Sequence, residues 1–254
     1  MALLAILVGG LLMTGPEAIF DDAAAGRQVA QEVTVEITEG EKKQSTVRYW
    51  LYLPEDYGQP RKRYPLMLFL HGAGERGDDL DKVKLWGPPK RLEKGGKLPF
   101  IVASPQCPKG RWWNTEELLK LLDHLQATLA VDNERVYVTG LSMGGYGSWN
   151  LLAAAPNRFA AAVPICGGGD PATADKFTHV AVWAFHGDAD EIVPAAKSKA
   201  MVDAIEAAGG KLARLTLYPG VAHNSWSETY ANEKLYHWLL SHKRKKPGKK
   251  GRTE

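Results

Sequence analysis

The serine at position 142 lies in the surroundings that point most directly to chemistry. It is the centre of the segment GLSMG at 140–144, which follows a strand-like run at 136–139 and opens a stretch of small residues that can form a helix. A sharp strand-to-helix turn of this kind, a nucleophile elbow, presents a serine hydroxyl at the carboxyl edge of a sheet. The flanking glycines have a steric reason, because side chains there would collide with neighbouring backbone. The segment therefore predicts that Ser142 is a nucleophile.

A serine hydroxyl becomes a strong nucleophile only when a histidine accepts its proton and an acid orients that histidine. In hydrolases with such an elbow, the acid and then the histidine follow the serine along the chain. Of the three histidines after the last expected strand, His223 lies in a loop, whereas His237 lies in an expected helix and His242 begins the basic tail. We therefore expect His223 to be the base. Asp190 is the expected acid, and Asp188 is the alternative.

A tetrahedral intermediate at the serine needs about two backbone N–H groups that bind its oxyanion. We expect these donors to be the N–H of Met143, directly after the serine, and the N–H of Ala73 in the segment HGAG at 71–74. Gly72 would let that loop approach a substrate closely. His71 precedes Ser142 in the chain, so we expect it to brace this loop, and we expect a supporting role for His186 as well.

These residues must be positioned by an α/β fold. Alternating segments at 32–38 and 46–53 predict an antiparallel hairpin, and the apolar run YPLMLFL at 64–70 predicts a strand buried on both faces. Helical patterns follow Asn114, run from 194 to 208 and run from 232 to 241. Further strands are expected at 100–104, 135–139, 159–164, 180–185 and 212–218.

This alternation predicts a mostly parallel, twisted sheet of about eight strands, with helices on both faces and an antiparallel N-terminal hairpin. Ligands of such sheets bind beyond the carboxyl ends of the strands, and the candidate residues collect there. The segment 166–179, which joins the strands after the serine, is short and glycine-rich. We therefore expect no cap domain and an open cleft.

Length and composition indicate one domain, which we expect at 30–242. The chain has 254 residues, of which 44% are hydrophobic and 24% charged. The apolar run at 2–13 and the alanines at 23–25 predict a signal peptide at 1–25 and a secreted or periplasmic protein; the alternative is an apolar N-terminal helix of a cytosolic protein. No later segment predicts stable insertion into a membrane.

The net charge of +3 comes from the C-terminal tail at 243–254, which has seven Lys or Arg and one Glu and leaves about −3 for the rest. This tail is rich in Pro and Gly as well, so we expect it to be disordered. Loose attachment to an anionic surface is the alternative to simple solvation. Aromatic residues are not interleaved with its charges, which argues against nucleic-acid binding.

The two cysteines, Cys107 and Cys166, each follow an expected strand, and these two strands are not expected to be neighbours. We therefore predict two free thiols. A cysteine nucleophile is the alternative to Ser142, but neither cysteine lies in a strand-turn-helix elbow.

Five motifs in order resemble the α/β-hydrolase superfamily over residues 49–240. They are HGAGERG at 71–77, SPQC at 104–107, GLSMGGYG at 140–147, HGDADEIVP at 186–194 and PGVAHNSW at 219–226. More narrowly, they are similar to its bacterial branch of predicted peptidases and esterases, related to polyhydroxybutyrate depolymerases and feruloyl or acetylxylan esterases. The resemblance supports Asp190, in its HG-x-x-D setting, and His223. We expect neither a cofactor nor a metal.

The leading hypothesis is a secreted serine hydrolase that cleaves carboxylic esters, with acyl esters of polysaccharides as candidate substrates. Its partner would be a small or polymeric ester. Trp113 and Trp226 are expected to wall the substrate, as could Trp112; the alternative is that these rings pack loops onto the body. A serine peptidase with the same triad and a catalytically inactive binding protein remain the alternative functions, and the oligomeric state stays open.

Overall fold

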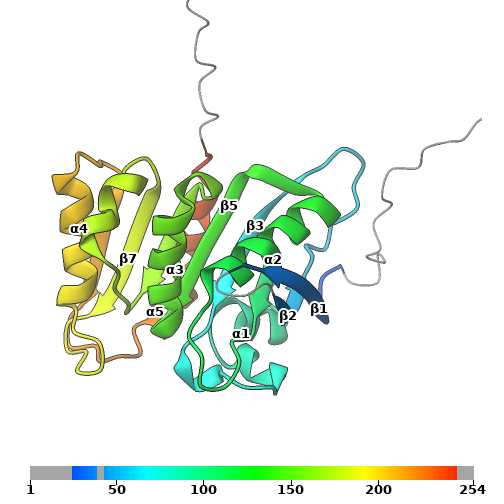
Figure 1. The fold of residues 1–254 in the computed structure, drawn as a ribbon, viewed down its shortest axis with the longest axis horizontal. Coiled ribbons are helices and arrows are strands. Elements are labelled where there is room, and N and C mark those ends of the chain that lie inside the picture. The colour runs from blue at the N-terminus through cyan, green and yellow to red at the C-terminus, as the bar shows by residue number, and fades with distance from the viewer. Residues whose placement is uncertain (1–24, 39–42, 245–254) are drawn as a thin grey trace, which may run out of the picture.

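A computed structural model describes residues 25–38 and 43–244 of the chain (Figure 1). The predicted signal peptide lies outside the described residues apart from Ala25, and the basic tail lies outside them from position 245 on. The described strands are β1 (Gln28–Ile37), β2 (Lys43–Tyr52), β3 (Tyr64–Leu70), β4 (Ile101–Pro105), β5 (Val131–Leu141), β6 (Ala161–Ile165), β7 (Ala181–Gly187) and β8 (Ala213–Tyr218).

One eight-stranded sheet contains all of these strands, in the order β1-β2-β4-β3-β5-β6-β7-β8. β1 pairs with β2, and β2 with β4, in antiparallel fashion, whereas the pairs from β4 through β8 are parallel. The predicted hairpin and the mostly parallel sheet are therefore confirmed. β4 and β6 are not neighbours, and the cysteines that follow them, Cys107 and Cys166, are free, as predicted. The structure adds that both are buried.

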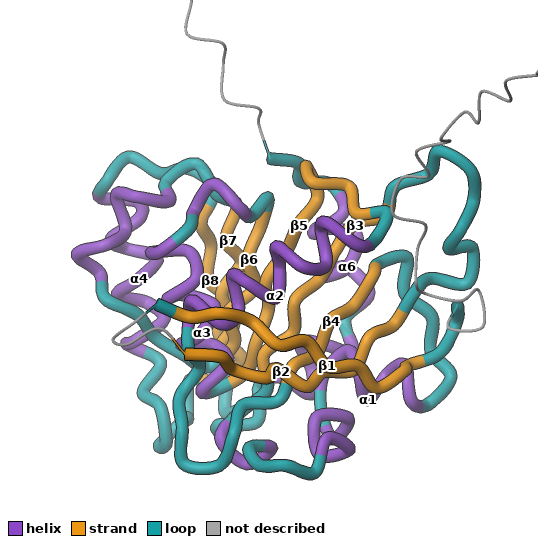
Figure 2. The backbone as a smooth tube through the Cα atoms, turned by 45° about the vertical axis from the view of Figure 1, so that its right-hand side comes forward, coloured by secondary structure: helices purple, strands orange, loops and turns teal. Residues whose placement is uncertain are grey.

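The helices lie on both faces of the sheet (Figures 1 and 2). The α-helices are α1 (Gly87–Glu93), α2 (Thr115–Thr128), α3 (Met143–Ala154), α4 (Ala196–Ala207), α5 (Trp226–Ala231) and α6 (Glu233–Leu240). The 3-10 helices are η2 (Ala73–Glu75), η3 (Leu80–Leu85), η4 (Pro156–Arg158) and η5 (Pro171–Phe177).

Two apolar cores correspond to these two faces. Residues of α2, α3 and α4 pack in one core, and residues of η3, α1, α5 and α6 pack in the other. β3 contributes to both because all seven of its side chains are buried, as its unbroken apolar run predicts. The central strands are thus shielded from water on both sides, and their carboxyl ends lead into the loops that carry polar residues.

Local sequence signals set where three of the helices begin or end. The side chain of Asn114 accepts a hydrogen bond from the N–H of Glu117 at the start of α2, and the side chain of Asn232 caps α6 by accepting from Lys234. α4 begins at Ala196, two residues after the expected start, and ends before the glycines at 209–210.

The segment from 71 to 98, for which the sequence predicted no helix, contains η2, η3 and α1. These elements are short, and α1 carries prolines in its first turn, so the sequence lacks the apolar periodicity that predicts a helix there. The connection from β6 to β7 is fully described and holds only η5, which agrees with the expected lack of a cap domain.

Candidate active site

Ser142 occupies a strained turn between β5 and α3. Its backbone has φ 52° and ψ −115°, a conformation that non-glycine residues rarely adopt. The turn is held from both sides, since the N–H of Ser142 donates to the carbonyl of Ile165 at 3.0 Å and its carbonyl accepts from the N–H of Tyr146 at 3.1 Å. This geometry is the sharp elbow that the sequence predicts.

The glycines around the serine are needed because backbone segments meet there. A Cβ added to Gly144 would lie 1.9 Å from the carbonyl oxygen of Leu70, and one added to Gly140 would lie 2.4 Å from the carbonyl oxygen of Gly144. Glycine thus allows α3 to start directly against the end of β3. That contact brings the elbow beside the loop that begins at His71.

The three candidate catalytic side chains form a continuous hydrogen-bonded line. Nε2 of His223 lies 2.9 Å from Oγ of Ser142, and Nδ1 of His223 lies 2.7 Å from Oδ2 of Asp190. Three loops, after β5, β7 and β8, bring these residues together from positions far apart in the chain. The histidine side chain is 20% exposed, whereas the aspartate side chain is fully buried. Such a line can move a proton from the serine hydroxyl to the imidazole.

Asp190 is fixed and kept ionised by its surroundings. Its Oδ1 accepts hydrogen bonds of 2.9 Å from the N–H groups of Ile192 and Val193. Burial opposes ionisation, but the hydrogen bond from His223 and these backbone donors outweigh it and lower the pKa of Asp190 below its ordinary value. An ionised acceptor holds the proton of His223 on Nδ1, which leaves Nε2 free to accept from the serine.

His186 contacts the same aspartate oxygen as His223. Its Nε2 lies 2.8 Å from the carbonyl of Val193 and 3.2 Å from Oδ2 of Asp190, and its Nδ1 lies 2.7 Å from Oγ of Ser198. Burial is the main cause that lowers the pKa of His186, so the ring is neutral and Nε2 carries the proton toward these two acceptors. The supporting role expected for His186 agrees with these contacts.

Asp188, the alternative acid, lies on the surface. Its Oδ1 accepts a 2.6 Å hydrogen bond from the N–H of Gly220, so it joins the loops after β7 and β8. His237 is exposed on α6, and His242 bonds to the carbonyl of Trp238. The structure therefore brings Asp190 and His223 to Ser142.

The two expected oxyanion donors lie on segments that meet at the elbow. Met143 is the first residue of α3, and Ala73 is the first residue of η2. Gly72, which precedes Ala73, packs so closely on the elbow that an added Cβ would lie 2.8 Å from Cδ1 of Leu141. The donor roles of both residues remain predictions.

His71 braces this loop, which is the role expected for it. Its Nε2 accepts from the N–H of Cys107 at 2.9 Å, and its Nδ1 lies 2.6 Å from the carbonyl of Gly72. Burial lowers the pKa of His71 to about 4, so the ring is neutral at physiological pH and Nδ1 carries its proton.

Trp113 and Trp226 differ in their surroundings. Trp113 donates from Nε1 to the carbonyl of His71 at 3.2 Å and packs on the His71 ring at 4.7 Å between centroids, so it holds the loop in place. Trp226 meets the ring of His223 edge-on, with 5.2 Å between centroids. Trp112 is 62% exposed and contacts Tyr146, four residues after the serine.

Among the described residues, one group of three side chains has metal-ligand chemistry: Cys166, Asp190 and His223, with ligand atoms within 4.8 Å of one another. Asp190 and His223 already bond each other, and burial raises the pKa of Cys166 to about 12. This pKa makes Cys166 a poor nucleophile.

Residues 108–236, just over half of the chain, match the Dienelactone hydrolase family. The chain belongs to the dienelactone hydrolase family. This family match includes the elbow, the loop after β7 and the loop after β8, and it agrees with the resemblance to α/β-hydrolases found in the sequence.

Two relatives of this member of the dienelactone hydrolase family have names that refer to ester cleavage or depolymerisation. "Probable feruloyl esterase C" of Aspergillus terreus is 25% identical over 197 residues, which cover 76% of this chain and 70% of that protein. Poly(3-hydroxyalkanoate) depolymerase C of Paucimonas lemoignei is 43% identical over 121 residues, which cover 41% of this chain and 28% of that protein.

Of two similar solved structures, one is an esterase and the other shares only the fold. The crystal structure of a thermostable esterase is 33% identical, with a TM-score of 0.70 over 84% of this chain and 63% of that chain. The chain thus spans less than two thirds of that esterase. Dipeptidyl peptidase 4 of Porphyromonas gingivalis shares the fold alone, with a TM-score of 0.65 at 14% identity over 83% of this chain and 35% of that chain. The family match and the names of the esterase relatives support an esterase-like hydrolase.

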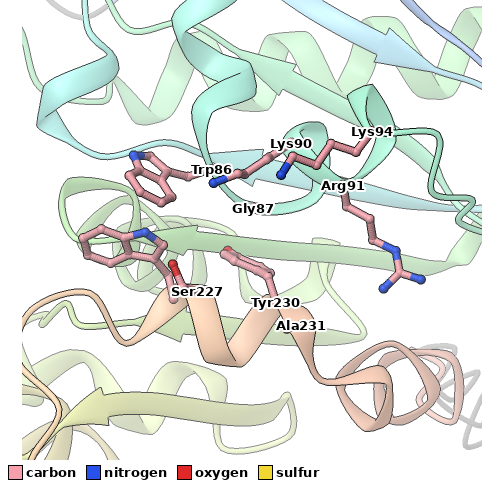
Figure 3. A pocket seen from close by; sticks show the side chains of 9 residues that line it. Trp86, Gly87, Lys90, Arg91, Lys94, Ser227, Tyr230 and Ala231 are labelled. Atoms are coloured by element: carbon pink, nitrogen blue, oxygen red, sulfur yellow. The ribbon is translucent and has the colours of Figure 1, made fainter.

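The sequence analysis missed a pocket between α1 and α5 (Figure 3). Trp226, one of its lining residues, contacts the His223 ring. One side of the pocket is lined by Trp86, Lys90, Arg91 and Lys94. The segment WGPPKR at 86–91 carried a partial signal, because prolines are favoured in the first turn of a helix and two basic residues follow them directly. Among the described residues, no helix is long and apolar enough to cross a membrane.

Proposed function

We propose that this chain is a serine carboxylic-ester hydrolase that forms an acyl-enzyme on Ser142. The observation that carries the proposal is the line of hydrogen bonds from Ser142 Oγ through His223 to Asp190, at 2.9 and 2.7 Å. Three features support these roles: Asp190 is ionised, Nε2 of His223 lies against the hydroxyl, and Ser142 is a partly exposed residue held in a strained turn.

In the first step, Oγ of Ser142 attacks the carbonyl carbon of the ester while Nε2 of His223 accepts the hydroxyl proton. The resulting imidazolium is stabilised by the carboxylate of Asp190. The carbonyl oxygen becomes an oxyanion, for which the N–H groups of Met143 and Ala73 are the proposed donors. The intermediate then collapses, the bond to the alcohol oxygen breaks, and His223 gives its proton to the departing alcohol.

In the second step, His223 accepts a proton from a water molecule, whose oxygen attacks the acyl carbon on Ser142. Collapse of the second intermediate breaks the bond to Oγ, which regains its proton from His223, and releases the carboxylic acid. Between β6 and β7, where the chain is fully described, η5 is the only element, so no cap domain is inserted there. We propose acyl esters of polysaccharides as substrates, which agrees with the feruloyl esterase names among the relatives.

The nucleophile is tested by labelling the protein with a fluorophosphonate and by measuring p-nitrophenyl acetate hydrolysis. We expect stoichiometric labelling of the native protein, no labelling of Ser142→Ala, and a loss of about 10⁶-fold in kcat for that variant. Ser241→Ala, which changes a serine at the end of α6, is the matched control and should label normally. Full labelling and activity of Ser142→Ala would refute the proposal, and a native protein without activity would point to a binding protein.

A serine peptidase with the same triad is the second candidate, and the shared fold of dipeptidyl peptidase 4 favours its inclusion. Aminoacyl p-nitroanilides distinguish the two, because their leaving group is an amine. We expect ester turnover and little anilide turnover. Turnover of the anilides alone would replace the esterase by the peptidase.

We further propose that the protein is exported and acts in the periplasm or outside the cell, with residues 1–25 as its signal peptide. The apolar run at 2–13 supports this proposal. N-terminal sequencing of protein from the culture medium and the periplasm tests it, and a mature chain that begins after residue 25 is the expected result. A chain that starts at Met1 and stays in the cytosol would contradict it.

A further inference from the structure

A pocket of about 250 Å³ lies between α1 and α5, and its two sides differ in chemistry (Figure 3). Trp86, Lys90, Arg91 and Lys94 come from α1 and the residues directly before and after it, whereas Trp226 and Tyr230 come from α5. None of the described residues that line the pocket is acidic. Its walls therefore combine cationic heads with three aromatic rings.

Two of the cations are not neutralised by the protein. In the part of the chain that the structure describes, no carboxylate forms an ion pair with Lys90 or Lys94. The ammonium of Lys90 lies 4.3 Å from the ring centre of Trp86, where an aromatic face stabilises a cation. Glu93, the acid within α1, is paired with Lys84, and Arg91 is paired with Glu233. Lys90 and Lys94 thus leave positive charge at the pocket.

The uncompensated charge sets the chemistry of a ligand that would fit. Lys90 and Lys94 both line the pocket, and their ammonium groups can each donate hydrogen bonds. An oxygen-rich anion would accept these hydrogen bonds and would balance the lysine charges.

The aromatic walls select for a ring. The ring centres of Trp86 and Trp226 lie 5.8 Å apart, with an angle of 71° between the ring planes. Tyr230 lines the same pocket. Indole surfaces present apolar area next to a polar N–H, which suits the apolar faces and polar edges of a sugar ring. A ring with one carboxylate matches the combination of aromatic walls and cations better than a fatty acyl chain does.

The position of the pocket indicates which part of the ester substrate it binds, the acyl group or the leaving alcohol. Trp226 forms its wall and also meets the His223 ring at 5.2 Å. The alcohol oxygen must approach Nε2 of His223 to receive its proton, whereas the acyl carbon is held at Ser142. Neither Ser142 nor Met143 lines the pocket. The leaving alcohol is therefore the group that can extend past Trp226.

We infer that this pocket is a subsite for an acidic sugar, a uronic-acid unit that carries the acylated hydroxyl or adjoins the sugar that does. This inference rests on the proposed ester hydrolysis at Ser142. Lys90 and Lys94 would bind the carboxylate, and Trp86 and Trp226 would pack on the ring. The substrate class becomes an acylated acidic polysaccharide.

The test compares acetate release from a mono-acetylated methyl glucuronoside with release from its uncharged glucuronamide, since both have the same leaving hydroxyl. We expect the native enzyme to favour the acid, and Lys90→Met combined with Lys94→Met to lower the acid-to-amide ratio of kcat/KM by about tenfold. High salt should lower the ratio for the native enzyme as well. Lys120→Met is a control, because Lys120 is an exposed lysine on α2, over the opposite face of the sheet, and it should leave the ratio unchanged.

A matched aryl pair, meta-acetoxybenzoate and meta-acetoxybenzamide, separates sugars from other carboxylated rings. An acid preference confined to this pair would overturn the assignment to a sugar. Equal turnover of the glucuronate and the glucuronamide, or an unchanged ratio in the double variant, would overturn the subsite while ester hydrolysis stands. If the folded native protein hydrolyses neither glucuronoside and no simple aryl ester, the proposed function fails and the subsite fails with it.

Discussion

Oδ2 of Asp190 lies 2.7 Å from Nδ1 of His223, although 33 positions separate the two residues in the chain. α4 and β8 lie between them, and these elements return the chain to the same edge of the sheet. Asp188, only two positions earlier, instead accepts from the N–H of Gly220. The pair of aspartates therefore offers a matched test of the proposed acid.

Asp190→Asn should lower kcat for p-nitrophenyl acetate by roughly 10³- to 10⁴-fold, because an amide no longer holds the His223 proton on Nδ1 or stabilises the imidazolium. Asp188→Asn removes a surface carboxylate and should change kcat less than about tenfold, within what a shifted loop causes. Steady-state kinetics with both variants check this expectation. Similar losses in the two variants would argue against Asp190 as the acid.

Gly144→Ala should destabilise the protein by about 3 kcal/mol, since overpacking costs free energy and the new Cβ would lie 1.9 Å from the carbonyl oxygen of Leu70. Gly74→Ala is the control, because nothing lies within 4 Å of a Cβ at that position. Its effect on the free energy of unfolding should stay within about 0.5 kcal/mol. Urea denaturation measures both values, and a Gly144→Ala protein of native stability would contradict the packing described for the elbow.

Stability should fall as the pH is lowered from about 6.5 to about 4, in part because of His71. The folded protein holds the pKa of this 1% exposed side chain at about 4, so the unfolded chain binds the proton first as the pH falls. The contribution of His71 is full above pH 6.5 and should decline by at most about 3 kcal/mol by pH 4.

Urea denaturation across this range, with His71→Gln as the comparison, isolates the contribution of His71. The variant lacks the titrating group, so its stability should depend less on pH than that of the native protein. His186 also has a lowered pKa and is present in both proteins, so its effect cancels when their stabilities are compared at each pH. Equal pH dependence in the two proteins would show that His71 is not neutral and buried as described.

Both cysteines should resist thiol reagents until the protein unfolds. Burial raises the pKa of Cys107 to about 11 and that of Cys166 to about 12, so the reactive thiolate is scarce at neutral pH and neither sulfur is accessible. Titration with a disulfide reagent should detect two thiols in denaturant and almost none before. Rapid alkylation with loss of esterase activity would instead revive the alternative of a cysteine nucleophile.

The mostly parallel sheet was predictable because its signals are local. The unbroken apolar run of β3 marks a strand buried on both faces, and Asn114 and Asn232 mark the starts of α2 and α6. The region from η2 to α1 was missed, since its helices span seven residues or fewer and have little apolar periodicity.

The sequence by itself determined the elbow and the order of serine, acid and histidine, because the glycine spacing and the strand-helix alternation are properties of neighbouring residues. It did not decide whether Asp190 or Asp188 is the acid, or whether the tryptophans pack loops onto the body or contact the substrate. Tertiary structure decided which carboxylate lies against Nδ1 of His223, that Trp113 bonds to the carbonyl of His71, and that Trp226 adjoins a basic pocket. These facts depend on distances between segments far apart in the chain, which only the closed packing of sheet and helices sets.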